Sequence, residues 1–358
     1  MLLSCSRVAG RLGRSQPPPN ARSVSIGVLG AAFDKGQTRS GASLGPGAVR
    51  QTGVLKDLTA LGHTVRDLGD LRLQEAVPAE YRAEDGRARM KNATSVGRFN
   101  QQLSERVSSA LGQHDVVVTL GGDHSIAIGT IHGHGQTVRH DKLAVLWVDA
   151  HADINTPLTS DSGNFHGKPL SFLMRGMEAF HLDLPDLRWC KPCLHPSKLV
   201  YIGLRAVDPL ERVAIQEFGI RAYAMREIDR LGIDKVVEMA LDQLGAGVGA
   251  DSSLHVSFDV DALDPSEAPC TGTPVRGGLS LREGQTVMEE VCKWGTLRSM
   301  DVVEVNPQLG TPQQAQYTAD AARHLLLATF GRYRGGNAPE GSQLPRPEIK
   351  PDPRTHPH

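Results

Sequence analysis

The chain has 358 residues, of which 39% are hydrophobic and 22% are charged, and its formal net charge is -1 at pH 7. Its length allows one large hydrophobic core or two ordinary ones, and its composition is typical of a soluble globular protein. The near-zero charge gives no electrostatic basis for a nucleic acid or membrane-surface partner, and no apolar run approaches the roughly 20 residues that span a bilayer.

In chain order, the first feature is an N-terminal segment without acidic residues. Arginines and serines are frequent in it, and the first acidic residue of the chain is Asp34. This composition is typical of a mitochondrial transit peptide, although the run QPPPN at 16–20 would interrupt an amphipathic helix. We predict that residues 1–23 are a transit peptide for the mitochondrial matrix, with a plain N-terminal extension as the alternative.

Eight short apolar, β-branched runs then alternate with segments of helical periodicity. Runs such as VVVTL and LAVLWV are apolar on both faces, which is typical of strands covered by helices on two sides. The alternation predicts a three-layer α/β/α fold with a mostly parallel sheet, formed by a single domain over residues 24–332. The expected strands lie at 24–29, 64–69, 115–120, 143–149, 199–204, 221–225, 254–260 and 300–305, and the expected helices at 47–61, 93–112, 125–137, 209–218, 227–244, 281–293 and 312–330.

The last segment, residues 333–358, is rich in proline and glycine and has no periodicity. We expect it to be a disordered tail or an arm that docks on a neighbouring subunit.

The five cysteines are sparse and odd in number, which argues against a disulfide framework and favours a reducing compartment. Cys190 and Cys193 have the spacing of a thioredoxin-type redox pair. In that motif the first cysteine begins a helix, whereas here Pro196 and the strand-like run LVYIGL follow closely. We therefore expect a loop with two incidental thiols.

Metal-type ligands cluster where three of the expected strands end. GGDHS at 121–125 follows VVVTL, DAHAD at 149–153 follows LAVLWV, and Asp259-Val260-Asp261 follows LHVSF. The carboxyl ends of parallel strands converge on one edge of the sheet, where ligand sites form. Side chains two residues apart on a strand point to the same side, so the members of each cluster can approach one centre.

The number of carboxylates indicates two divalent cations. Four acidic side chains in one crevice would repel one another unless cations compensated their charge, and two histidines add nitrogen ligands. A set of carboxylates and imidazoles without thiolate disfavours structural zinc and suits manganese. Any one of these aspartates alone could equally be a helix N-cap, but the three clusters together favour a metal centre. The residues are His124, Asp149, His151, Asp153, Asp259 and Asp261.

These motifs, with TGTPVRGG at 271–278, resemble in order and spacing the signature regions of the ureohydrolases, the family that includes arginases and agmatinases. The resemblance covers about residues 24–332. It implies an eight-stranded, mostly parallel sheet, two Mn²⁺ per subunit and a homotrimer. It also implies that the six residues above are the metal ligands, and that a metal-bridging hydroxide attacks a guanidino substrate. The acid-free extension resembles that of the mitochondrial arginases.

Within this family, the segment NTPLTSDSGNFHG at 155–167 resembles the arginase loop that binds the α-carboxylate of the substrate, a group that agmatine lacks. The resemblance therefore implies hydrolysis of L-arginine to L-ornithine and urea. Glu304 matches the residue that binds the guanidinium, Asp153 the acceptor of the hydroxide proton and His166 the proton shuttle, although His166 could instead only bind substrate. The implied substrate contacts are Asn155, Ser160, Ser162, Asn164, Asp208 and Thr273.

Asp161 is a departure from the pattern, because the family usually has a small hydroxyl residue there. A negative charge beside the carboxylate contacts predicts a raised KM for arginine. Two further departures, Ala206 and Ala32, are expected to have small effects. Four residues resemble positions of intersubunit ion pairs in trimeric members, with ordinary solvated charge as the alternative: Asp229, Arg282, Glu283 and Arg334.

Two competing functions remain open at this stage. Another ureohydrolase activity, such as that of an agmatinase, is disfavoured by the loop at 155–167. A catalytically silent metal-binding scaffold is disfavoured because the six ligand residues, His166 and Glu304 are all present.

Overall fold

The computed structural model describes residues 23–73, 80–82, 88–139, 141–245, 252–332 and 334–336. The predicted transit peptide, apart from Ser23, and most of the predicted tail at 333–358 lie outside these residues.

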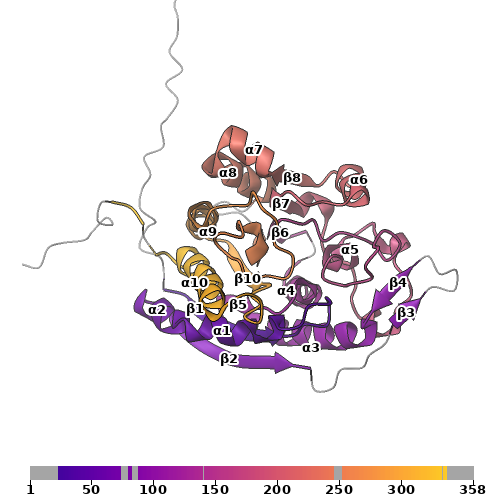
Figure 1. The fold of residues 1–358 in the computed structure, drawn as a ribbon, viewed down its shortest axis with the longest axis horizontal. Helices are drawn as coiled ribbons and strands as arrows, with labels where there is room; N and C mark the ends of the chain where they lie inside the picture. The colour runs from indigo at the N-terminus through magenta and orange to yellow at the C-terminus, as the bar shows by residue number, and fades with distance from the viewer. Residues whose placement is uncertain are drawn as a thin grey trace, which may run out of the picture.

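One eight-stranded sheet forms the centre of the molecule (Figure 1). Every strand pairing within it is parallel, so the expected mostly parallel sheet of eight strands is confirmed. In spatial order the strands are β2 (Thr64–Arg72), β1 (Ser25–Ala32), β5 (Val116–Leu120), β10 (Leu297–Val303), β9 (Ser253–Asp259), β6 (Leu143–Val148), β7 (Leu199–Leu204) and β8 (Arg221–Ala224).

Helices cover both faces of this sheet, giving the predicted three layers (Figure 1). One face packs against α1 (Gly45–Gln51), α2 (Val54–Ala60), α7 (Met225–Leu231), α8 (Ile233–Leu244), α9 (Leu281–Trp294) and α10 (Pro312–Thr329). The other packs against α3 (Ala93–Leu111), α4 (Ala127–Gly135), α5 (Pro169–Leu173) and α6 (Pro209–Glu217).

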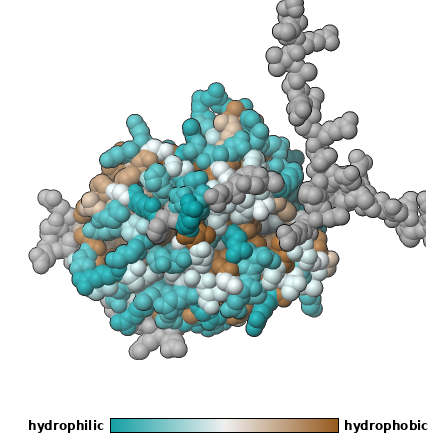
Figure 2. Space-filling view, turned by 180° about the vertical axis from the view of Figure 1, so that it is seen from behind, coloured by the Kyte–Doolittle hydropathy of each residue, from teal (hydrophilic) through white to brown (hydrophobic). Residues whose placement is uncertain are grey.

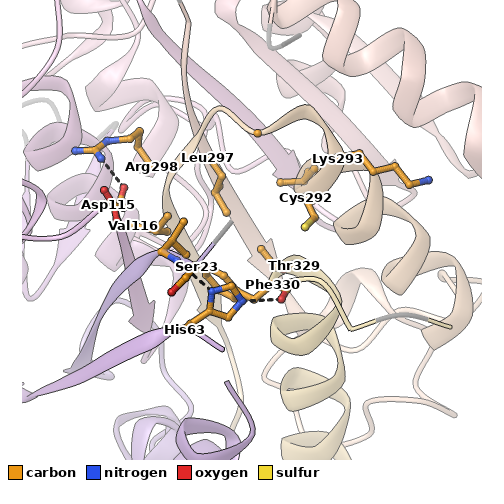
Figure 3. A pocket seen from close by; sticks show the side chains of 13 residues that line it. Ser23, His63, Asp115, Val116, Cys292, Lys293, Leu297, Arg298, Thr329 and Phe330 are labelled. Atoms are coloured by element: carbon orange, nitrogen blue, oxygen red, sulfur yellow. Dashed lines mark hydrogen bonds between the residues drawn. The ribbon is translucent and has the colours of Figure 1, made fainter. Parts of the chain in front are cut away.

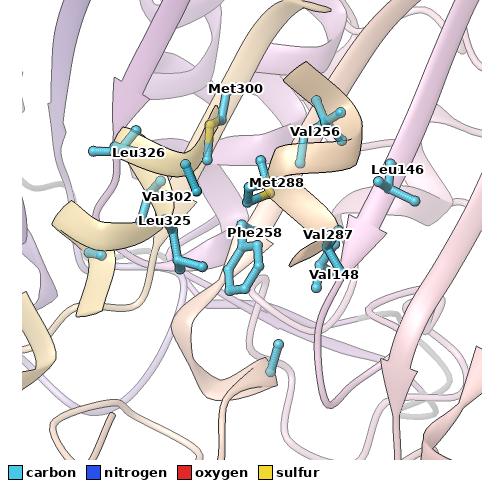
Figure 4. Packing of buried hydrophobic residues seen from close by; sticks show 14 of the residues in the cluster. Leu146, Val148, Val256, Phe258, Val287, Met288, Met300, Val302, Leu325 and Leu326 are labelled. Atoms are coloured by element: carbon cyan, nitrogen blue, oxygen red, sulfur yellow. The ribbon is translucent and has the colours of Figure 1, made fainter. Parts of the chain in front are cut away.

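Strand β9 shows how the sequence builds the two layers. Val256 and Phe258 point into the apolar cluster under α9 and α10, where they meet Met288 and Leu325 (Figure 4). Their neighbours His255 and Ser257 face the opposite layer, since side chains alternate along a strand. Removing the Phe258 ring would cost about 3–5 kcal/mol, the usual range for a large buried aromatic side chain.

Two of the predicted long helices are broken in the structure. The expected helix at 47–61 is divided into α1 and α2 at Gly53, which has φ 84°. The expected helix at 227–244 is divided into α7 and α8 at Gly232, which has φ 77°. Both conformations lie outside the helical region and favour glycine, so each glycine ends one helix and begins the next.

Two short elements were not predicted. A two-stranded antiparallel ladder joins β3 (Glu80–Arg82) to β4 (Arg89–Lys91), and α5 has five residues. These elements are too short to produce a recognisable period.

The surface seen from behind is mostly hydrophilic, with small hydrophobic areas scattered among polar ones (Figure 2). In the described part of the chain, none of the helices combines the length and apolar character needed to cross a bilayer.

Candidate metal centre

The predicted ligand residues come together at the carboxyl ends of three strands in the middle of the sheet, β5, β9 and β6, and β10, which lies between β5 and β9, carries Glu304. The strands themselves are held in register, with Val148 at the end of β6 opposite Phe258 on β9. The residues that follow them therefore emerge side by side, as expected for an open parallel sheet.

His124 forms the first group of potential ligands. It lies in the short helical turn after β5, fully buried, and its Nδ1 faces three carboxylate oxygens. These are Oδ2 of Asp149 at 3.0 Å, of Asp259 at 3.1 Å and of Asp153 at 3.3 Å. One imidazole nitrogen among three carboxylates is a set of donors that a single divalent cation can take.

His151 forms the second group. Its Nδ1 lies 3.4 Å from Oδ1 of Asp149 and 3.2 Å from Oδ2 of Asp261. Asp149 thus has one carboxylate oxygen in each group, Oδ2 toward His124 and Oδ1 toward His151. The two groups share a carboxylate, which would let Asp149 contact two neighbouring cations.

Hydrogen bonds from the protein orient these carboxylates. Oδ2 of Asp149 accepts the indole N–H of Trp147 at 2.9 Å, and its Oδ1 accepts the main-chain N–H of His151 at 2.7 Å. Oδ1 of Asp259 accepts the main-chain N–H of Asp261 at 2.8 Å. Carboxylates held in this way keep their remaining lone pairs directed into the centre.

The carboxylates are buried and close together, so their negative charges repel one another strongly when no cation is bound. Burial and the charges of Asp261 and Asp149 raise the pKa of Asp259 well above its ordinary value. Burial and the charge of Asp149 raise the pKa of Asp153 to about 6. Burial also acts on Asp149, but the neighbouring imidazoles of His124 and His151 hold its pKa below the usual value.

The orientation of the His124 ring indicates a metal rather than a hydrogen-bond network. Its Nε2 lies 2.9 Å from the Ser257 hydroxyl, whereas its buried Nδ1 has no hydrogen-bond partner of acceptable geometry in the described chain. A nitrogen that faces three carboxylates and makes no hydrogen bond fits the role of a metal ligand, with Ser257 fixing the ring. The residues present therefore fit a divalent metal centre.

Glu304 lies beside this centre, 1% exposed, directly after β10. Its Oε1 accepts the main-chain N–H of His124 at 2.9 Å and its Oε2 accepts the side-chain amide of Gln37 at 2.7 Å. Burial and the charge of Asp123 raise its pKa to about 8. The two hydrogen bonds thus fix the carboxylate in place, and they do not fully offset the effects of burial and of Asp123 on its pKa.

Two of the candidate catalytic residues have a left-handed backbone. Among the non-glycine residues that the structure describes, Asn92, Asp153 and Glu304 have positive φ, with values of 49° for Asp153 and 64° for Glu304. Such conformations cost roughly 1–3 kcal/mol for residues other than glycine and are concentrated at functional sites.

His166 is close to Glu304, with Nδ1 3.8 Å from Oε1. Burial and the neighbouring charges of Lys168 and His151 lower its pKa to about 3, so the imidazole is neutral at neutral pH.

The predicted substrate loop is arranged around Asn155. Its amide donates to Oδ2 of Asp208 at 2.9 Å, so the residues expected at the α-carboxylate and at the α-amino group are in contact. Ser160 and Ser162 lie together, with hydroxyl oxygens 3.4 Å apart, and Ser162 accepts the N–H of Asn164. Thr273 donates its hydroxyl to Oδ2 of Asp261 at 3.0 Å. It therefore contacts a predicted metal ligand.

The structure adds residues that the sequence did not single out. Gln37 holds Glu304, and buried Asp123 accepts the main-chain N–H groups of Gly36 and Ser125. Buried Glu211 accepts the N–H groups of Ile154 and Asp208, and Lys168 is buried behind the substrate loop. Of these residues, only Asp123 could have been found from the sequence, because it lies inside the motif GGDHS.

The two clustered cysteines lie in a loop, as expected. Cys190 and Cys193 lie outside any helix, and neither is in a disulfide. Burial raises the pKa of both thiols, that of Cys193 to about 12, which is the opposite of the low value that a redox-active cysteine needs.

Two of the predicted intersubunit residues have partners within this chain. Glu283 accepts the N–H of Ser280 in a capping box at the start of α9. Arg334 pairs with Glu289 through Nε at 2.6 Å.

A separate cavity of about 440 Å³ lies at the opposite edge of the sheet, near the amino ends of β1, β5 and β10 (Figure 3). Its polar groups already have partners: His63 contacts the carbonyl of Phe330, and Arg298 donates to the carbonyl of Asp115. It shares no residue with the metal centre.

Comparisons with known proteins agree with this geometry. The arginase family matches residues 24–331. Mitochondrial arginase-2 of Rattus norvegicus is 47% identical over 345 residues, which cover 96% of this chain and 95% of that protein. Arginase-1 of Homo sapiens is 45% identical over 320 residues, covering 89% and 96%. The native arginase structure from Bacillus caldovelox has a TM-score of 0.77 at 38% identity and covers 87% of this chain and 99% of that one.

Proposed function

Because this chain belongs to the arginase family, we propose that it hydrolyses L-arginine to L-ornithine and urea at a centre of two divalent cations. The observation that carries the proposal is the position of Asp149, whose two carboxylate oxygens face two different histidines. We propose manganese as the metal, because the ligands are carboxylates and imidazoles without thiolate. The proposed ligands are His124, Asp149, His151, Asp153, Asp259 and Asp261.

A guanidinium carbon is a poor electrophile, since its charge is permanent and delocalised. Divalent cations held by the proposed ligands would supply hydroxide near neutral pH by lowering the pKa of bound water. The task of this chain's own residues is to hold the guanidinium still and to move protons.

Glu304 is placed to bind the guanidinium. Its carboxylate is fixed by the His124 N–H and the Gln37 amide, yet each oxygen keeps a lone pair for a paired, charge-assisted hydrogen bond. Asp153 is the proposed acceptor of the nucleophile's proton, which it passes to the departing amine. His166, beside Glu304, is the proposed proton shuttle to solvent, because a neutral imidazole can both accept and donate a proton.

The loop at 155–167 is proposed to recognise the amino acid end of the substrate. Its hydroxyl and amide groups, from Asn155, Ser160, Ser162 and Asn164, are donors suited to an α-carboxylate. Asp208, in contact with Asn155, is the proposed partner of the α-amino group. Thr273, which donates a hydrogen bond to Asp261, is proposed as a further substrate contact.

We also propose that the chain acts in the mitochondrial matrix as a homotrimer, with residues 1–23 as a transit peptide before the catalytic domain at 24–332. The acid-free N-terminal composition and the similarity to mitochondrial arginase-2 support the location. Asp229, Arg282, Glu283 and Arg334 are the proposed sites of intersubunit ion pairs. Fusion of residues 1–23 to a fluorescent protein tests the location, and sedimentation equilibrium tests the trimer.

One assay tests the activity: urea release from L-arginine and from agmatine, measured on chelator-treated protein with and without added Mn²⁺. We expect manganese-dependent release from arginine. Release from agmatine alone would replace the arginase proposal with an agmatinase. No release from either substrate with manganese present would favour a silent scaffold, and full activity after exhaustive chelation would contradict the metal mechanism.

A further inference from the structure

Lys168 is a buried cation that the proposed reaction does not use. Its side chain is completely inaccessible to solvent, and it is the one lysine or arginine among the described residues that is buried. No carboxylate of the described chain lies within ion-pair distance of it. Burial lowers its pKa to about 7, with Asp153 and Lys91 as the nearest influential charges. Burying an ammonium group without an ion-pair partner reduces the stability of the fold, so we expect Lys168 to have a functional role.

The Lys168 ammonium is directed at the substrate loop. It donates to the main-chain carbonyl of Asn164, and the main-chain N–H of Lys168 donates to the carbonyl of Phe165 at 3.0 Å. Through these two hydrogen bonds, Lys168 closes the end of the loop into a single turn.

A second lysine holds the side chain of the same asparagine. Lys91, at the end of β4, donates from Nζ to Oδ1 of Asn164 at 3.3 Å, and its main-chain N–H donates to the carbonyl of Gly163. Since a lysine can only donate, this contact identifies the oxygen of the Asn164 amide. The amide nitrogen, Nδ2, makes no hydrogen bond within the described chain and is left as a free donor.

We propose that Lys168 and Lys91 are positioning residues for α-carboxylate recognition, holding Asn164 so that its Nδ2 donates to the carboxylate of an amino acid substrate. This inference rests on the proposed function. Lys91 also places positive charge beside the Asn164 side chain. A bound carboxylate would in turn favour the charged form of Lys168. The structure therefore assigns to these lysines the preference for a substrate that has a carboxylate over one that lacks it.

The test compares two ligands that differ only in that group, L-ornithine and putrescine, by calorimetry on manganese-loaded protein. Lys168→Met keeps the length of the side chain and removes its charge and donor. We expect about a tenfold loss of ornithine affinity, the size of one hydrogen bond to a charged group, with putrescine affinity unchanged. In urea assays KM for arginine should rise while kcat stays within twofold.

Lys91→Met should act in the same direction and, because Lys91 is only half-buried, it keeps the test valid if Lys168→Met does not fold. Lys198→Met is the matched control, since Lys198 also donates to a main-chain carbonyl, that of Leu244, but lies far from the loop. In an Asn164→Ala background, Lys168→Met should no longer change ornithine affinity by more than about twofold.

Equal losses for ornithine and putrescine, or a full loss that persists in the Asn164→Ala background, would overturn the inference and leave Lys168 a purely structural residue. Failure of the proposed function has a different signature. In that case the unsubstituted protein would release no urea from arginine and bind no ornithine, whatever the variants do.

Discussion

The indole ring of Trp147 stacks on the imidazole of His124, with ring centroids 4.0 Å apart and an angle of 8° between the planes. Trp147 also donates its indole N–H to Asp149. One side chain of β6 thus supports a histidine from one strand end and a carboxylate from another.

This relationship predicts that Trp147→Phe weakens metal binding. The phenyl ring can still stack on His124, but the hydrogen bond to Asp149 is lost, and such supporting contacts are typically worth 10- to 100-fold in metal affinity. Titration of the apoprotein with Mn²⁺ measures the change. Trp189→Phe is the control, because Trp189 donates to main-chain carbonyls away from the centre. Equal affinities for the two variants would contradict the prediction.

Asp259→Asn should have opposite effects on the apoprotein and the metal-loaded protein. Burial and neighbouring carboxylates make the Asp259 charge unfavourable without cations, so the apoprotein should unfold at a higher temperature than the unsubstituted apoprotein. With metal the order should reverse, because a ligand that binds only the folded state stabilises it in proportion to its affinity. Thermal unfolding with and without Mn²⁺ measures the change in Tm in both states. A lower apoprotein Tm would show that Asp259 is mainly a structural hydrogen-bond acceptor.

Glu304→Gln should reduce catalysis while leaving the metal centre intact. The amide keeps the shape of the carboxylate but cannot pair with a guanidinium through two charged acceptors. We expect kcat/KM for arginine to fall by about 100-fold or more, the size of losing one preorganised electrostatic contact. Manganese affinity should stay within about threefold of the unsubstituted protein. If both fell together, Glu304 would be acting through His124, whose N–H it accepts.

Asp161→Ser should lower KM for arginine. Asp161 is exposed in the middle of the predicted substrate loop, and we expect its charge to repel an incoming α-carboxylate. Because solvent screens an exposed charge, the expected decrease in KM is modest, about two- to fivefold. The effect should shrink at high salt and should appear equally in Asp161→Asn. An unchanged KM in both variants would remove Asp161 from the account of substrate affinity.

Lys168 should make stability depend on pH in a defined direction. Burial lowers its pKa from 10.5 to about 7, so between these values the unfolded chain binds a proton that the folded chain does not. This contribution to the free energy of unfolding therefore rises as pH increases from about 7 to 10.5. In Lys168→Met this rise should be absent. Denaturant unfolding at pH 7 and pH 9.5 measures the free energy of unfolding of both proteins. If this free energy changed by the same amount between the two pH values in both proteins, the pKa of Lys168 would not be depressed.

The layered fold could be predicted because its signal is local. Runs such as LAVLWV are apolar on both faces, and only a strand covered by helices on two sides buries them fully. The helix breaks at Gly53 and Gly232 were missed for an equally local reason. The hydrophobic periodicity continues through each glycine, and the sequence does not reveal which glycines adopt a positive φ.

From the sequence alone it could be predicted that Asp149, His151, Asp259 and Asp261 lie close together, because they stand at or just after the carboxyl ends of parallel strands, which meet at one edge of the sheet. Only the tertiary structure decided which residues support them. Gln37 and Glu304 are 267 positions apart, and Lys91 and Asn164 are 73 apart, so no local pattern could relate either pair. Such contacts arise when loops and strands from distant parts of the chain become neighbours in the folded protein, and the order of the central strands, β5-β10-β9-β6, is not written in any single segment.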